Sequence, residues 1–250
     1  MKKRDFKLYE EGYEEMPFEA TLVEYRRKIV IQSLLRYKHD RILEVGCGMD
    51  PLFKHFSEYV SMTVIEPCES FYENAIGLKN NDRIEIYNGL FEDVADQLQQ
   101  HTFDFIIVSC LLHEIPDTHK FLSKIHEISN KETTIHINVP NANSFHRILA
   151  MEMGLIESVF EFSATNVKMQ QSRVFNLESL TDLLRNQKFK AEDSGSYFIK
   201  PFTHHQMEQL INTGILTREI LDGLFGMTKY YPDLGSEIFV NCTQNGNSGL

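Results

Sequence analysis

The sequence predicts an α/β protein built on a doubly wound, mostly parallel sheet of about seven strands. Three observations lead to this prediction. Short apolar runs alternate with stretches whose apolar residues recur at helical spacing, as expected when strands and helices take turns. The run Phe103–Val108 is almost entirely apolar, which is typical of a parallel strand covered on both faces. The first predicted strand ends in a glycine-containing turn, a feature of ligand-binding sheets of this class.

Length and charge limit the protein class. The chain has 250 residues, enough for one large domain or a core domain with an appendage. Hydrophobic residues make up 42%, which is ordinary for a folded protein. Aspartate and glutamate total 36 against 25 lysines and arginines, and the net charge of −11 would repel phosphate backbones. We therefore expect no nucleic-acid partner.

We expect a cytoplasmic protein that does not span a membrane. No apolar run approaches the ~18 residues of a membrane helix. The basic start, Met1–Arg4, leads into an acidic segment rather than an apolar one, so no secretory signal is expected. The four cysteines are widely spaced without a Cys-x-x-Cys pair, which indicates reduced thiols.

The first half of the chain reads as an arm, a helix and then alternating strands and helices. Residues 1–17 are acidic and tyrosine-rich, so we expect a loose arm or a flap over a site. Apolar residues at near-helical spacing predict an amphipathic helix over Phe18–Tyr37. The strands predicted next are Ile42–Val45, Val60–Ile65, Arg83–Tyr87, Phe103–Val108 and Thr133–Val139, and the helices between them are Leu52–Glu58, Ser70–Leu78, Asp93–Leu98 and Thr118–Ser129.

The second half is less regular. Pro140–Gly154 reads as a loop and then a helix capped by Asn143 or Ser144, and Leu155–Val174 has the weak periodicity of a cover or loop. Further helices are predicted at Asn176–Gln187, Thr203–Asn212 and Thr217–Gly226, and strands at Phe189–Gly195 and Ser236–Cys242. We expect a ligand-binding core over residues 18–140, a helical cover with the last strands over 141–243, and a frayed tail over 244–250.

The stretch Asp40–Leu52 organises the core. Its apolar strand stops at Gly46, Gly48 follows, and Pro51 suits the first turn of a helix. Both glycines can adopt positive φ and let a ligand lie on the backbone, and a helix start adds free N–H groups. Glu66 ends the next strand about 20 residues later, where an acid accepts hydrogen bonds from ribose hydroxyls. The turn and the acid together predict a nucleotide-like ligand.

With two later motifs, these residues resemble the class I S-adenosylmethionine-dependent methyltransferases. The first motif of that family is present as Glu44-Val45-Gly46-Cys47-Gly48, and its ribose-binding acid as Glu66-Pro67. The third-strand motif is present as Gly89–Asp93 and the fourth-strand motif as Phe103–Ser109. The resemblance covers residues 20–140 in the order of the family. A narrower resemblance, over Asn138–Arg147, is to methyltransferases that tailor bacterial polysaccharides and secondary metabolites.

The resemblance implies a Rossmann-like fold with S-adenosylmethionine as the cofactor. It assigns residues to each part of that molecule by their motif positions. These are Glu44, Gly46, Cys47 and Gly48 at the methionine end, Glu66 and Pro67 at the ribose, Gly89, Leu90, Phe91 and Glu92 at the adenine, and Ser109 after the fourth strand.

The motifs depart from the usual family pattern at two positions. Asp50 stands where a third glycine is usual, and aspartate is one of the few other residues that tolerate a left-handed conformation. Leu90 replaces an acid that holds the adenine amino group in many relatives, so adenine would rest on Leu90 and Phe91. A nicotinamide dehydrogenase would need a third glycine at position 51, which is Pro51, so we reject that alternative.

Two histidines are candidate general bases for methyl transfer. His113 follows the fourth strand and His146 follows the fifth, at the edge of the sheet where ligands bind. His113 could instead only touch the cofactor pocket, and His146 could only form hydrogen bonds at a helix start. Asn138, Asn141 and Arg147 are candidates for binding a polar substrate.

We expect methylation of an oxygen atom of a small-molecule or glycan-type acceptor, such as a sugar or a phosphate-bearing compound. N-methylation of a small molecule and non-catalytic binding of S-adenosylmethionine remain alternatives. We expect no metal, because the adjacent pair His204-His205 lacks the spacing of a helical metal pair and no acidic or cysteine cluster completes a site.

Overall fold

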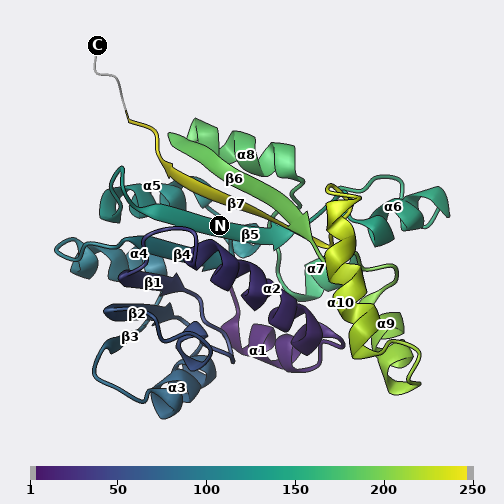
Figure 1. Cartoon of the computed structure of the whole chain (residues 1–250), viewed down its shortest axis with the longest axis horizontal. Helices are drawn as coiled ribbons and strands as arrows, with labels where there is room; N and C mark the ends of the chain where they lie inside the picture. Colours follow the sequence, from purple (N-terminus) through teal and green to yellow (C-terminus); the bar gives the residue numbers. More distant parts are fainter. Residues whose placement is uncertain (1–3, 247–250) are drawn as a thin grey trace.

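The computed structural model describes residues 4–246 and is centred on one seven-stranded sheet (Figure 1). The strands are β1 Arg41–Val45, β2 Ser61–Glu66, β3 Ile84–Asn88, β4 Phe105–Ser109, β5 Thr134–Pro140, β6 Phe189–Tyr197 and β7 Glu237–Gln244. They lie in the order β3-β2-β1-β4-β5-β7-β6. β7 is antiparallel to both of its neighbours, and the other pairs are parallel. The predicted doubly wound, mostly parallel sheet is confirmed.

Helices cover both faces of this sheet. Ile42 and Phe105 pack with α2 and α3 on one face, whereas Leu43 and Ile106 pack with α4, α5 and α8 on the other, because successive strand residues point to opposite sides. The helices are α1 Phe6–Glu14, α2 Glu19–Leu34, α3 Glu69–Leu78, α4 Phe91–Val94, α5 Thr118–Ile128, α6 Phe145–Glu152, α7 Ala164–Lys168, α8 Leu177–Asn186, α9 His204–Asn212 and α10 Arg218–Gly226. Short 3₁₀ helices are η1 Leu52–Lys54, η2 Ala95–Leu98, η3 Leu112–Glu114 and η4 Met227–Lys229.

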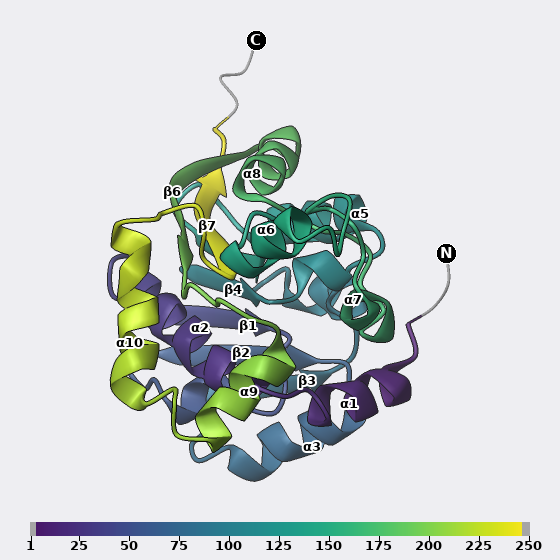
Figure 2. The same cartoon turned by 90° about the vertical axis from the view of Figure 1, so that its right-hand side faces the viewer.

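The sheet order creates a ligand-binding edge. From β1 the chain winds outward through β2 and β3, then returns to the other side of β1 to form β4 and β5. Ligands of open α/β sheets bind outside the carboxyl ends of the strands at this reversal. Figure 2 looks onto that edge and shows α1, α6, α7 and α9 arranged around it.

The C-terminal helices are anchored to the N-terminal half. Leu22 and Tyr25 of α2 pack against Phe198, Met207 and Leu221, which come from the end of β6, from α9 and from α10. The cover over the edge of the sheet is therefore built from both ends of the chain. No helix among the described residues is long and apolar enough to cross a membrane.

Three local predictions need comment. The helix expected over Leu52–Glu58 is only the 3₁₀ turn η1, where Phe53 and Phe56, three residues apart, both enter the core. The expected arm contains a regular helix, α1. Of the expected tail, residues 244–246 are described and 247–250 lie outside the described residues. The division of the chain at residue 140 stays a prediction.

Gly235 offers a test of this packing. An added Cβ would lie 2.5 Å from the Tyr197 backbone nitrogen, so Gly235→Ala should lower the free energy of unfolding by about 1–3 kcal/mol. Gly223→Ala is the matched control, because its Cβ would meet nothing within 4 Å on an exposed turn of α10. The control should stabilise the protein by up to about 1 kcal/mol. Urea unfolding measures both changes, and equal effects would contradict the described junction of β6 and β7.

Candidate active site

A cavity of about 940 Å³ opens at the carboxyl edge of the sheet. Most of the predicted site residues line it, and they come from the ends of β1 to β5 and from the cover. The predicted residues that line it are Glu44, Gly46, Cys47, Gly48, Glu66, Pro67, Leu90, Phe91, Glu92, Ser109, His113, Asn141, His146 and Arg147. Gly89 and Asn138 do not line the cavity.

The glycine turn has the conformation that its sequence predicts. Gly46 and Gly48 have φ of 77° and 58°, values that favour glycine. A Cβ at Gly48 would meet only the Tyr13 hydroxyl, at 3.9 Å, so the turn borders open space. Aspartate tolerates a left-handed conformation, but Asp50 does not adopt one. Asp50 has a negative φ, and its carboxylate pairs instead with Arg27.

Glu44 occupies the buried side of this turn. Its carboxylate accepts a hydrogen bond from the Leu52 backbone nitrogen at 3.1 Å. The predicted free N–H groups of a helix start are therefore not available here, since η1 is only three residues long and Glu44 uses its first N–H. Burial raises the pKa of the Glu44 carboxyl to about 8.

Glu66 is fixed in the same wall of the cavity. Its two carboxylate oxygens accept hydrogen bonds from the backbone nitrogens of Cys68 at 2.9 Å and Gly48 at 3.0 Å. Only 3% of the residue is exposed, and burial raises its pKa. Among residues 4–246, neither Glu44 nor Glu66 forms an ion pair. Two buried carboxyl groups thus meet at one end of the cavity without an ion pair, although Arg27 lies close enough to lower the pKa of Glu44 against the larger effect of burial.

The N-terminal helix closes over this end. Tyr9 and Tyr13 of α1 pack edge-on against Phe71 of α3, with ring centroids 6.4 and 5.6 Å apart. Arg4 forms an ion pair with the buried Glu114, whose pKa is raised to about 7 by burial. These residues were missed in the sequence, although tyrosines four apart would face one side of a helix.

A buried ionic network forms the wall contributed by α2 and the last strands. Arg26 donates two hydrogen bonds to the Glu237 carboxylate, one of them at 2.9 Å, and a third to Glu19 at 3.0 Å. The Tyr197 hydroxyl also donates to Glu237. No local motif marks this network, because its members lie on α2, β6 and β7.

The far end of the cavity holds basic side chains. The Lys200 ammonium lies 3.1 Å from a ring nitrogen of His204, and the buried lysine has its pKa lowered to about 7 by desolvation. His146 lies nearby and is half-buried, its buried Nδ1 has no partner among the described residues, and desolvation lowers its pKa well below the usual range. Arg147 donates through Nε to the Val159 carbonyl oxygen at 2.9 Å, which fixes part of the cover.

His113 lies under α1, closer to Glu114 than to the basic end. Only 2% of His113 is exposed, and its Nδ1 has no partner among residues 4–246. Burial lowers the pKa of the His113 imidazole to about 3. Both candidate bases therefore stay neutral near pH 7. Gly89 has φ of 147°, and a Cβ there would crowd Val94 at 3.2 Å, so its role is to shape the turn before Leu90.

The structure does not support substrate binding by the two asparagines. Asn138 is fully buried, and its amide bonds to Ser109, to His136 and to the Cys110 backbone nitrogen, which fixes Cys110 at a positive φ. Asn141 donates to two backbone carbonyl oxygens and accepts from a third residue's N–H, so its amide is also fully used. Both amides organise the backbone, a role that sequence cannot distinguish from binding.

No metal site appears among the described residues. They contain no group of three histidine, cysteine, aspartate or glutamate side chains that could hold an ion. All four cysteines are free thiols.

Comparison with known proteins places this arrangement in a broader context. A family model described as a methyltransferase domain matches residues 22–193, well over half of the chain. No curated protein matches the sequence. An S-adenosylmethionine-dependent methyltransferase from Thermotoga maritima, described as a possible histamine N-methyltransferase, is 17% identical with a TM-score of 0.61, over 96% of this chain and 100% of that one.

Two other solved structures are similar over most of their length. A plantazolicin methyltransferase, solved with S-adenosylhomocysteine, is 14% identical with a TM-score of 0.59, over 92% of this chain and 88% of that one. The [4+2]-cyclase SpnF is 15% identical with a TM-score of 0.57, over 87% of this chain and 80% of that one. At these identities the likeness concerns the fold, and the cyclase indicates that one fold hosts different reactions.

The buried Glu44 carboxyl predicts a pH-dependent stability without ligand. It loses its proton near pH 4.5 in the unfolded chain but only near pH 8 when folded. The folded state therefore binds more protons between these values, and this contribution to stability falls as the pH rises. Glu44→Gln removes this titrating carboxyl. The free energy of unfolding of the variant should therefore increase relative to that of wild type as the pH rises, by up to about 1.4 kcal/mol per pH unit.

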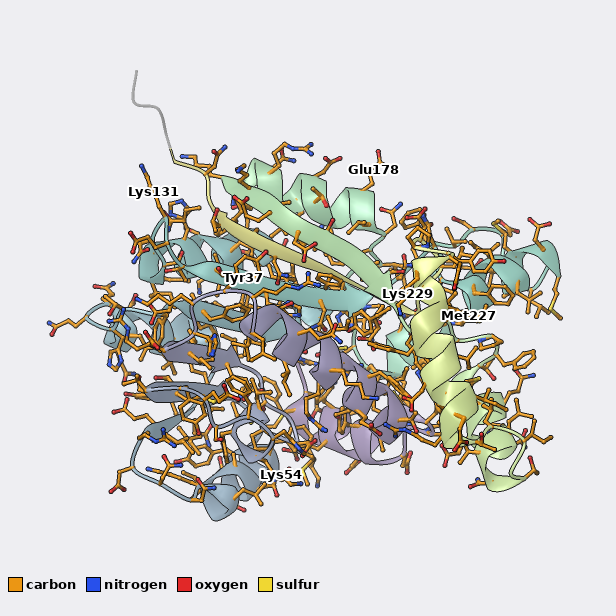
Figure 3. The ribbon with its side chains drawn as sticks, viewed as in Figure 1. Tyr37, Lys54, Lys131, Glu178, Met227 and Lys229 are labelled. Atoms are coloured by element: carbon orange, nitrogen blue, oxygen red, sulfur yellow. The ribbon has the colours of Figure 1, made fainter. Side chains whose placement is uncertain are left out.

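Urea unfolding between about pH 5 and 8 measures this difference. Glu178→Gln is the matched control, because Glu178 points outward from α8 into solvent (Figure 3). A difference between Glu44→Gln and wild type that does not change with pH would show that the Glu44 carboxyl is not protonated at neutral pH.

Proposed function

The chain belongs to the methyltransferase-domain family of class I S-adenosylmethionine-dependent methyltransferases, and on that basis we propose that it methylates an oxygen atom of a small-molecule or glycan-type acceptor. It is an enzyme whose cofactor is S-adenosylmethionine. The acceptor, its methylated atom and the residue roles below are our proposals. The observation that carries them is one cavity with two buried carboxyl groups that form no ion pair at one end, and Lys200, Arg147 and the unpartnered Nδ1 of His146 at the other.

The residues present fit the cofactor. Bound S-adenosylmethionine supplies a methyl group on a positively charged sulfur, and it also carries an ammonium group, so buried carboxylates without cations suit it. Glu66, fixed by two backbone N–H groups, would accept hydrogen bonds from the ribose hydroxyls. Because Gly46 and Gly48 have no side chains, the methionine end of the cofactor would contact the backbone of this turn. Cys47 lies between the two glycines, and Glu44 lies on the buried side of the turn.

The adenine would lie against apolar side chains. Leu90 and Phe91 line the cavity beyond β3, and Glu92, whose pKa is raised by burial, lies in the same wall. Pro67 and Ser109 also line the cavity. Together with the glycine turn, these residues would hold the cofactor and exclude water from it, and both effects favour methyl transfer.

His146 and His113 are the proposed bases. Each is a neutral imidazole with a buried, unpartnered Nδ1 in the cavity wall, so each has a nitrogen that can take a proton from an acceptor hydroxyl. His146 lies beside Lys200 on the side of the cover, and His113 lies beneath α1. We favour His146, because the cover is the wall that remains for an acceptor once the cofactor occupies the ends of β1 to β3.

An amine acceptor is the second candidate, since one similar structure is described as a possible histamine N-methyltransferase. An amine would need a free carboxylate beyond the cofactor end. Glu19 and Glu237 are both paired with Arg26, and Glu114 is paired with Arg4. These pairings favour an oxygen acceptor. Free thiols and the net charge of −11 support a cytoplasmic enzyme without a nucleic-acid substrate.

Calorimetric titration tests the cofactor site. S-adenosylmethionine and S-adenosylhomocysteine should bind wild type, and Glu66→Gln should weaken both about 10- to 100-fold because the ribose loses a charged acceptor. His119→Ala is the matched control, since His119 is exposed on α5. Binding of NAD without either adenosyl ligand would overturn the proposal.

Turnover tests the proposed bases. Release of S-adenosylhomocysteine over a panel of hydroxyl-bearing compounds and sugars identifies an acceptor, and His146→Ala should then lower kcat about 10²- to 10⁴-fold. Cofactor affinity should stay unchanged, which separates loss of a base from loss of fold. If neither His146→Ala nor His113→Ala lowers kcat at saturating cofactor, the general-base proposal fails.

A further inference from the structure

The two ends of the cavity differ in the side chains that line them. At the cofactor end, Glu44 and Glu66 form no ion pair among the described residues. Beyond it, Glu19 and Glu237 share the single positive charge of Arg26 and also face Lys200. At the far end, Lys200, His146 and Arg147 line the cavity, and none of them forms an ion pair among the described residues.

Lys200 is the clearest case. Lys200 comes shortly after β6 in the chain, and its side chain lines the cavity. Only 2% of the residue is exposed. Its Nζ has no ion-pair partner among residues 4–246, and its hydrogen-bond partner there is the His204 ring at 3.1 Å. An ammonium group has three hydrogens to donate, and the imidazole accepts one of them. A buried lysine with unfilled donors is costly unless a ligand accepts from it.

Two residues of α6 extend this basic surface. Arg147 donates through its Nε and Nη2 to the carbonyl oxygens of Val159 and Glu161, and it forms no ion pair among the described residues. His146 has an unpartnered, buried Nδ1 in the cavity wall. Lys200 and Arg147 both lower the pKa of His146, after the larger effect of its burial, so the three groups share one region.

We propose that this basic end is the acceptor-binding site for a carboxylate, which accepts hydrogen bonds from Lys200 with His146 and Arg147 beside it. The inference rests on the proposed function and names the chemical class of its acceptor, a small molecule with a carboxylate group. A monoanion suits one free ammonium beside a guanidinium that is already bonded at two nitrogens. A cationic amine would be repelled here.

Carboxylate binding should be linked to proton uptake by Lys200. Burial holds the pKa of its ammonium near 7, and an anion beside it would raise that pKa. The charged or titratable groups that face Lys200 are His146 and Arg147 on α6, His204 on α9, Glu19 and Arg26 on α2, and Glu237 on β7. Glu19 and Glu237 already raise the pKa of Lys200, and a bound carboxylate should raise it further.

Nuclear magnetic resonance of lysine labelled with carbon-13 tests this directly. The protein is saturated with S-adenosylhomocysteine, and the Cε signal of Lys200 is assigned by its loss in Lys200→Met or, if that variant does not fold, in Lys200→Arg. Acetate should raise the titration midpoint of Lys200 by about one pH unit or more, the shift of a tenfold preference for the charged form. Acetamide, which has the same shape without the charge, should leave it unchanged.

The exposed Lys190, which pairs with Glu192 on β6, is the internal control and should respond to neither compound. An equal response of Lys200 to acetate and acetamide, or no response, overturns the inference and leaves the proposed function intact if S-adenosylhomocysteine binds. Failure of S-adenosylhomocysteine to bind overturns both. In a second measurement, glucuronate should bind the same complex at least about tenfold more tightly than glucose, and Lys200→Met should abolish that preference.

Discussion

The burial of two carboxylates beside a glycine turn is the constraint on which the site depends. Glu44 and Glu66 lie in the wall of one cavity, accept backbone hydrogen bonds and form no ion pair among the described residues. A buried carboxylate without a counter-charge favours its neutral form or a cationic ligand. We propose that the sulfonium cofactor provides this cationic ligand at the carboxyl edge of the sheet.

The sheet brings the glycine turn and Glu66 together. Parallel pairing of β1 with β2 sets Val45 beside Ile65, and the Gly46 nitrogen continues the ladder to the Ile65 carbonyl oxygen at 2.8 Å. The next residues of the two strands, the glycine turn and Glu66, are thereby brought together. Apolar packing on both faces of the sheet fixes these strand ends. The cover, tied to α2 through a third apolar cluster, supplies the basic end of the same cavity.

Sequence predicted the parts of this protein that are encoded locally. The strand, glycine turn and following acid are close in the chain, so Gly46, Gly48 and Glu66 could be found from spacing alone. Arg26 and Glu237 meet across 211 positions, and Lys200 lies in no motif, so no local pattern indicated them. The substrate-binding role predicted for Asn138 and Asn141 could not take account of their hydrogen bonds for a related reason. Most of their partners are groups of other elements, which only the folded chain brings within reach.

The most direct test of the central claim is a crystal structure of the protein with S-adenosylhomocysteine. We expect the ribose hydroxyl oxygens about 3 Å from the Glu66 carboxylate, with the amino-acid end on the Gly46–Gly48 turn. We also expect the space between His146 and Lys200 to remain open for an acceptor. A ligand whose ribose does not touch Glu66, or whose adenine lies against Lys200, would contradict the account.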